Sequence, residues 1–212
     1  MHLHPTEQVT QLISSLVDRA ERTGDRQLIG IIGAPGTGKT TFAEYVASQL
    51  PAGSCVIVPM DGFHLSNEIL DGTPLRARKG AIDTFDADGY VALIERIRRR
   101  AEDVVYAPSY RRGFEEPIAA SIAVPADIPY VITEGNYLLS PEEPWTRIPE
   151  LLDETWFVEV SDAIRIERLI ARHESFGMNH EQAVAWANST DEANARYVET
   201  TKSRADLTVT WW

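Results

Sequence analysis

Short apolar runs alternate with amphipathic stretches along most of the chain. The run 28–32 is rich in β-branched residues and precedes a glycine-rich turn, as a buried parallel strand would. Similar runs end just before Asp61 and Glu134, and another spans 155–160. Helical spacing of apolar residues predicts helices over 6–22, 39–50, 86–101, from Ser161 to about 176, and from Asn179 onward. Strands that alternate with helices indicate an α/β fold with a parallel sheet.

The place of some strands in the sheet follows from their flanks. Both 55–60 and 130–133 are predicted to be central strands, and the first should end at Pro59, because proline cannot donate a ladder hydrogen bond. The last stretch, 206–212, is predicted as an edge strand. The stretches 62–80 and 107–129 show neither period, and the second contains four prolines. We expect both to be irregular insertions that shape a substrate pocket.

Composition narrows the class of protein. The 212 residues, 43% hydrophobic and 25% charged, fit a single domain with a core of its own. A net charge of −12 disfavours nucleic acid and anionic membrane surfaces as partners. The sequence has no secretory signal pattern and no apolar run of about 18 residues, so we expect a cytoplasmic protein that does not enter a membrane. A homodimer remains open.

One motif carries specific chemistry. Residues 33–40 match G-x-x-x-x-G-K-[ST] between a predicted strand and a predicted helix, which is the context of a phosphate-binding P-loop. Backbone N–H groups of such a loop surround a phosphate, Lys39 reaches the β- and γ-phosphates, and the Thr40 hydroxyl ligates Mg²⁺. We therefore expect ATP and Mg²⁺ to bind at Gly33, Ala34, Pro35, Gly36, Thr37, Gly38, Lys39, Thr40 and Thr41.

Two carboxylates complete a candidate catalytic site. In open α/β sheets ligands bind beyond the carboxyl ends of the strands, so Asp61 and Glu134 should both face the phosphates. Transfer of a phosphoryl group needs a carboxylate near the accepting hydroxyl and an acidic group that positions the metal. We assign Asp61 to the first role and Glu134, with Thr40, to the second.

These residues resemble a branch of P-loop kinases that contains uridine kinase, phosphoribulokinase and bacterial type I pantothenate kinase. The similar segments cover most of the chain: 59–64 with its Asp-Gly-Phe, 79–86, the Glu-Gly at 134–135, and 204–206. The resemblance implies a three-layer P-loop fold with a short helical lid at about 162–202. It also implies ATP-dependent phosphorylation of a hydroxyl on a small sugar-, pantothenate- or nucleoside-like molecule.

The candidate acceptor site is drawn from the two insertions. Phe63, His64, Tyr110 and Arg112 are expected to contact the acceptor, together with Asp61. Uridine kinases follow their Pro-x-Tyr with aspartate, whereas Tyr110 is followed here by Arg111, which disfavours uridine.

Arginines on one helix are candidates for the lid. Arg165, Arg168 and Arg172 share a helical face by their spacing. The resemblance implies that Arg168 and Arg172 close on the transferring phosphoryl group, and a solvated basic face is the alternative.

A second class of function stays open, namely a P-loop ATPase or nucleotide-dependent switch without an acceptor. Residues 86–89 match the D-x-x-G of GTPases, but no N-K-x-D follows, and the helical pattern explains the match as a helix start.

Overall fold

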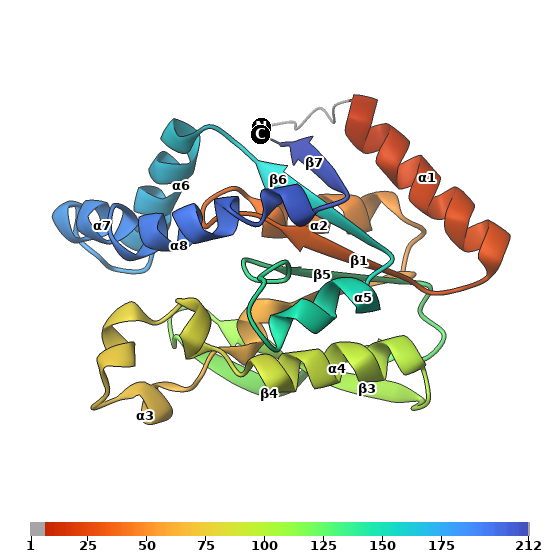
Figure 1. Ribbon diagram of the computed structural model, residues 1–212, viewed down its shortest axis with the longest axis horizontal. Coiled ribbons are helices and arrows are strands. Elements are labelled where there is room, and N and C mark those ends of the chain that lie inside the picture. The colour runs from red at the N-terminus through yellow and green to blue at the C-terminus, as the bar shows by residue number, and fades with distance from the viewer. Residues whose placement is uncertain (1–6, 212) are drawn as a thin grey trace.

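The computed structural model describes residues 7–211, which form a five-stranded parallel sheet flanked by helices (Figure 1). The sheet order is β2-β5-β1-β6-β7. Its strands are β1 (Gln27–Ile32), β2 (Cys55–Pro59), β5 (Tyr130–Gly135), β6 (Glu154–Glu159) and β7 (Leu207–Thr210). The α-helices are α1 (Glu7–Thr23), α2 (Lys39–Gln49), α3 (Asn67–Leu70), α4 (Ala87–Arg99), α5 (Ile148–Leu151), α6 (Asp162–Ser175), α7 (His180–Ala187) and α8 (Thr190–Glu199). Thr6 and Trp212, which the sequence placed at a helix start and a strand end, lie outside the described residues.

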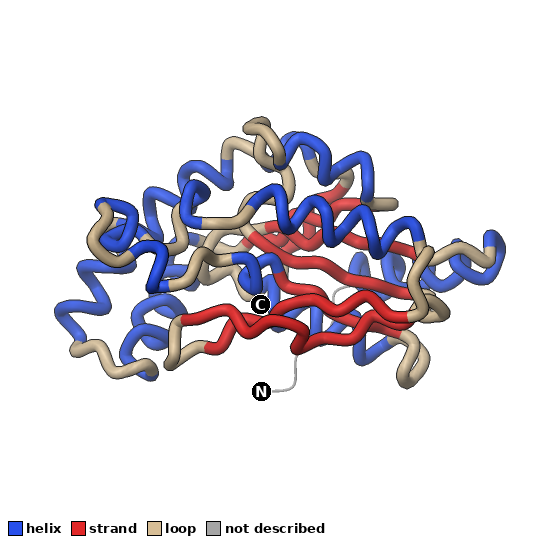
Figure 2. Tube along the Cα trace, turned by 90° about the horizontal axis from the view of Figure 1, so that it is seen from below, coloured by secondary structure: helices blue, strands red, loops and turns tan. Residues whose placement is uncertain are grey.

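Strand alternation sends apolar side chains into two cores, one on each face of the sheet. On β1, Leu28 and Ile32 join the core beneath α4 and α5, whereas Ile29 and Ile31 join the core beneath α1 and α2. Figure 2 shows the strands running side by side between helical segments. Because β1 is buried along its whole length, it occupies the middle of three layers, as the continuous apolar run predicts.

The start of α4 settles the meaning of the D-x-x-G match. Asp86 is the N-cap of α4, and its Oδ1 accepts a hydrogen bond from the backbone N of Gly89 at 2.9 Å. This is the ordinary capping role of an aspartate, which satisfies a free amide of the first helical turn. The helix-start interpretation of 86–89 is confirmed.

The prediction that the strand at 55–60 is central is wrong. β2 pairs only with β5 and forms one edge of the sheet. The run looked central because it is apolar on both faces: Val58 enters one core while Ile57 packs against the other. An edge position suits Pro59, which has no N–H to donate. The C-terminal strand β7 does lie at an edge, as predicted.

The prediction that 107–129 is irregular is also wrong. Strands β3 (Val104–Arg111) and β4 (Glu116–Pro125) form an antiparallel hairpin that runs below the main sheet in Figure 1. The prolines are tolerated because Pro108 lies where the pairing register shifts and Pro125 ends its strand. Side chains from Val104 to Ala107 alternate between buried and more exposed positions, as in a strand. The prolines in this segment hid that pattern in the sequence.

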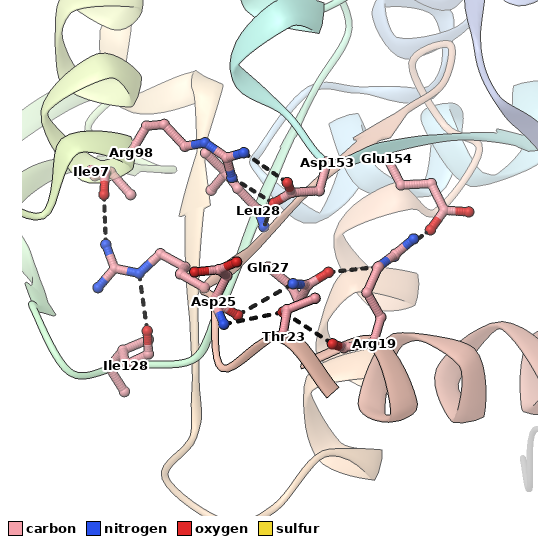
Figure 3. Close-up of polar contacts among 11 residues, drawn as sticks. Arg19, Thr23, Asp25, Gln27, Leu28, Ile97, Arg98, Ile128, Asp153 and Glu154 are labelled. Carbon is pink, nitrogen blue, oxygen red and sulfur yellow. Dashed lines mark hydrogen bonds and ion pairs between the residues drawn. The ribbon is translucent and has the colours of Figure 1, made fainter. Parts of the chain in front are cut away.

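Polar side chains bind the amino-terminal ends of the strands together. Asp153 accepts from the backbone N of Leu28 at 2.7 Å and from both terminal nitrogens of Arg98 at 2.7 and 2.8 Å (Figure 3). Arg26, only 4% exposed, donates to the carbonyl oxygens of four residues: Ile97, Pro125, Ala126 and Ile128. This end of the sheet is thus fixed by hydrogen bonds, and the opposite, carboxyl end is left for chemistry.

Replacing Arg26 should destabilise the fold without touching the carboxyl end of the sheet. Arg26→Met removes a donor from four carbonyl oxygens, of which those of Pro125 and Ala126 keep a second donor in Ile128 N and Arg100 Nε, and we expect the free energy of unfolding to fall by about 3 kcal/mol. Urea denaturation measures this change. The control Arg22→Met alters an exposed arginine near the end of α1 and should shift stability by less than about 0.5 kcal/mol. Equal effects of the two substitutions would contradict the assigned role of Arg26.

Candidate active site

The phosphate-binding loop joins the buried strand β1 to helix α2, as the motif predicts. Gly36 has φ of +84°, and a Cβ at this position would lie 2.6 Å from the carbonyl oxygen of Arg165. The Thr37 hydroxyl donates to the carbonyl oxygen of Ala34 at 2.9 Å and closes the turn from within. The neighbouring helix α6 and the loop's own side chains therefore hold the loop in shape.

The loop residues divide into two groups by position. Pro35, Gly36, Gly38, Lys39, Thr40 and Thr41 line a cleft of about 720 Å³ at the carboxyl end of the sheet. Ala34 and Thr37 instead border a separate cavity of about 310 Å³ behind the loop, and Gly33 is buried, where a Cβ would lie 2.6 Å from Thr37 Oγ1. The cleft therefore meets only the inner side of the loop.

Thr40 and Glu134 lie together at the floor of this cleft. The Thr40 hydroxyl donates to Glu134 Oε1 at 3.0 Å, and Glu134 is only 4% exposed at the end of β5. Burial raises the pKa of Glu134, and Lys39 opposes this effect. A hydroxyl next to a carboxylate is the kind of hard oxygen pair that Mg²⁺ takes together with phosphate oxygens, so the two residues fit that ion.

Asp61 lies in the turn Met60–Phe63 directly after β2 and lines the same cleft. Its Oδ2 accepts a hydrogen bond from Nη2 of Arg112, on the hairpin, at 3.1 Å. Burial raises the pKa of Asp61, but His64 when it is protonated, and Arg112, Lys39 and Arg172, lower it, and together they hold the pKa below its usual value. Asp61 is therefore a carboxylate at neutral pH.

Aromatic rings form the wall beside Asp61. The His64 ring lies between Phe85 and Tyr110, with centroid distances of 4.1 and 4.5 Å. All three of these residues line the cleft, as does Arg112. The structure thus brings His64, Tyr110 and Arg112 together with Asp61, as the sequence led us to expect.

Phe63 is placed differently from its neighbours. It does not line the cleft and packs edge-on against Tyr90 at 5.3 Å, next to the core under α4. Its side chain therefore faces the core while Asp61 and His64 face the cleft. Phe85 supplies the aromatic surface that was expected from Phe63; it lies in the segment 79–86 that resembles the kinases but was not among the predicted site residues.

The three arginines predicted on one face of α6 have different partners. Arg168 donates through Nη1 to the carbonyl oxygen of Thr37 at 3.2 Å and lines the cleft, and Arg172 lines it as well. Arg165 is buried and forms ion pairs with Asp162 and Glu192. Arg165 therefore serves the packing of α6 against α8, whereas the other two arginines are available to a ligand.

Helices α6 to α8 contribute side chains that sequence reasoning missed. Asp191, 7% exposed, accepts from His173 Nε2 at 2.6 Å and lies 3.9 Å from Nη2 of Arg172. The same wall includes Phe176, Met178, Trp186 and Asn194. Phe176 and Met178 lie in the turn between α6 and α7, and the others lie on the helices; their order follows no motif, so only the folded arrangement brings them together. No helix within residues 7–211 is long and apolar enough to span a membrane.

A P-loop after β1, with carboxylates at the ends of β5 and β2, the next two strands on one side of β1, is the arrangement of the P-loop kinase class. The family model described as "Phosphoribulokinase / Uridine kinase family" matches residues 28–211, and the chain belongs to this family. YggC of Escherichia coli (strain K12) is 37% identical over 188 residues, 87% of this chain and 77% of YggC. The "ATP-dependent kinase-like protein notR'" of Aspergillus versicolor is 37% identical over 145 residues, 64% of this chain and 84% of that protein.

A solved structure supports the same fold. The crystal structure described as a "putative fructose transport system kinase" from Silicibacter sp. TM1040 superposes with a TM-score of 0.86 at 36% identity. The match covers 97% of this chain and 100% of that chain. The three-layer P-loop fold predicted from the sequence is confirmed.

Filling the space at Gly36 should disable the loop. In Gly36→Ala the new Cβ must displace the backbone of α6 at Arg165, so we expect a lower melting temperature and loss of ATP binding by calorimetry. The matched control is Gly53→Ala, which has a similar φ of +75° but no atom within 4 Å of the new Cβ. The control should lose about 1–2 kcal/mol from its backbone conformation alone and keep ATP binding. Normal ATP binding by Gly36→Ala would refute the steric role.

Proposed function

We propose that this protein transfers a phosphoryl group from ATP to a hydroxyl of a small metabolite. One observation carries the proposal: a single cleft holds the phosphate-binding loop, Thr40 with Glu134, and the ionised carboxylate of Asp61 at the end of the neighbouring strand β2. A nucleotide switch needs only the first two. A kinase needs all three.

The residues divide the work by position. Lys39 and the loop amides bind the β- and γ-phosphates, and Thr40 with Glu134 holds Mg²⁺, which when bound offsets the negative charge of those phosphates. Asp61 accepts the proton of the attacking hydroxyl. Its pairing with Arg112 keeps it ionised, and the acceptor competes with Arg112 for the carboxylate.

In this proposal the segment 162–202, which contains helices α6 to α8, acts as the lid. They carry Arg168 and Arg172 into the cleft, where two cations stabilise the charge that spreads over the transferring group. Closure of the lid also removes water, which protects ATP from hydrolysis until the acceptor is bound.

The acceptor is a sugar-like or pantothenate-like alcohol in this proposal, with a nucleoside as the alternative. The Silicibacter relative named for fructose transport supports a sugar. Tyr110 and His64 provide a flat wall beside the paired Asp61 and Arg112, a lining that suits a small polar alcohol.

The test is the release of ADP from Mg-ATP across nucleosides, pantothenate and free sugars including fructose and ribose. Mass detection then identifies the phosphorylated product. We expect slow release alone, strong stimulation by a sugar or pantothenate, and weak stimulation by uridine. The highest kcat/KM with uridine would refute the assigned acceptor class. Lack of stimulation by every compound would favour the ATPase or switch.

Removal of the proposed base gives a sharper prediction. Asp61→Asn keeps the shape of the side chain but cannot take a proton, so kcat should fall at least about 10²-fold while ATP affinity stays nearly unchanged. Steady-state kinetics with the stimulating acceptor and calorimetry with ATP measure the two quantities. Asp83→Asn, the same change at an exposed position paired with Arg78, is the control and should retain full turnover. Near-normal kcat in Asp61→Asn would remove Asp61 from the mechanism.

A further inference from the structure

The basic side chains on the acceptor wall already have oxygen partners. Lys79 Nζ donates to Asn67 Oδ1 at 2.7 Å and to the carbonyl oxygen of Glu115 at 2.6 Å. Arg76 pairs with Asp71 at 2.9 Å, and Arg112 pairs with Asp61 at 3.1 Å. An anionic group on the acceptor would have to displace one of these oxygens. The cations at this wall are therefore already paired with oxygen atoms of the protein.

The same wall also has hydrogen-bond acceptors, and within residues 7–211 these have no donor. His64 Nδ1 lies 2.8 Å from the carbonyl oxygen of Asp61. A carbonyl oxygen can only accept, so Nδ1 must carry the hydrogen, and in the neutral ring Nε2 is then an unprotonated acceptor. Burial lowers the pKa of His64, which favours the neutral ring. Among residues 7–211 the His64 ring makes its hydrogen bond through Nδ1, so Nε2 is left to water or to a ligand in the cleft.

Packing keeps His64 in this orientation. Its ring is held between Phe85 and Tyr110, and the hydrogen bond to Asp61 fixes which nitrogen faces away from the backbone. A second acceptor lies in the same cleft: Asn136, two residues after Glu134, has a buried Oδ1 without a partner in the described part of the chain. Buried acceptors without a donor are rare because each has lost its bonds to water.

We propose that the acceptor is a polyhydroxylated, uncharged molecule whose hydroxyls donate to His64 Nε2 and, once its amide turns toward the ligand, to Asn136 Oδ1. These hydroxyls are distinct from the one that Asp61 deprotonates. The proposal rests on the proposed kinase function and narrows its substrate class. The ligand supplies donors because the wall has unused acceptors and paired cations.

The tautomer can be tested without any turnover. In long-range ¹H–¹⁵N spectra of the full-length protein, His64 should show a protonated Nδ1 and a pyridine-type Nε2, with His64→Asn used to assign its signals. Addition of D-ribose or D-fructose with Mg-ADP should shift the Nε2 resonance. An Nε2–H tautomer would overturn the proposal. So would an Nε2 signal that neither sugar moves.

Kinetics separate recognition from structure. His64→Asn keeps an N–H near the position of Nδ1 and removes the group at Nε2, so KM for the stimulating sugar should rise about tenfold with KM for ATP unchanged. His64→Gln can again present an oxygen where Nε2 lies and should restore KM to within about threefold. Equal KM increases in both variants would indicate a structural role.

Asn136→Leu tests the second acceptor. KM for the sugar should rise with KM for ATP unchanged, while the melting temperature of the free protein should fall little, because Oδ1 has no hydrogen bond to lose and Tyr137, which the Asn136 amide contacts, keeps its bond to the carbonyl oxygen of Gly80. A lower melting temperature with unchanged KM would show that Asn136 is structural.

Matched sugars test the substrate class itself. D-ribose should exceed 2-deoxy-D-ribose, and it should exceed the anionic D-ribose 5-phosphate, by at least about tenfold in kcat/KM for ADP release. Higher activity with the phosphate ester would overturn the proposal. If no compound stimulates ADP release but a sugar still moves the Nε2 resonance, the kinase function fails and the recognition of hydroxyls stands.

Discussion

The parallel pairing of β1 with β5 is the constraint on which the site depends. Ile32 lies opposite Gly135 in the register, so both strands end at the same level of the sheet. The phosphate-binding loop follows directly after β1, and Glu134, the second-last residue of β5, lies beside it. Slippage of this register by one residue would turn Glu134 to the other face of the sheet and away from Thr40. A five-stranded arrangement with β1 buried on both sides prevents that slippage.

The position of Asp61 follows from the same end of β5 through a close approach of two backbones. At Gly135 a Cβ would lie 2.5 Å from the Cβ of Met60, so only glycine lets the turn after β2 pack directly on β5. Asp61 is the next residue in that turn. The proposed base and the proposed metal ligand are therefore positioned by one contact between neighbouring strands, although they are 73 residues apart in the sequence.

The sequence predicted the parts of the site that local patterns determine. The loop motif, the two carboxylates at strand ends and the helix that starts after Asn179 each depend on a few adjacent residues, and the structure has them where expected. The hairpin was missed because its prolines outweighed a short alternation. The sequence could not show that Phe85, and not Phe63, lines the cleft. Phe63 packs on Tyr90 at the core, whereas Phe85 packs on His64, and this difference arises only in the folded chain.

Electrostatic interactions among the cations of the cleft favour binding of its proposed ligand. The chain carries a net charge of −12, yet three cations, Lys39, Arg112 and Arg172, lie close together in the cleft. Besides burial, the two arginines lower the pKa of Lys39, and Arg112 lowers the pKa of Arg172. Burial contributes the larger share of both shifts. Phosphate oxygens between these cations would remove the mutual repulsion and compete with Asp61 for Arg112. Because that competition frees a carboxylate oxygen where the hydroxyl must attack, nucleotide binding itself would prepare the base for the acceptor.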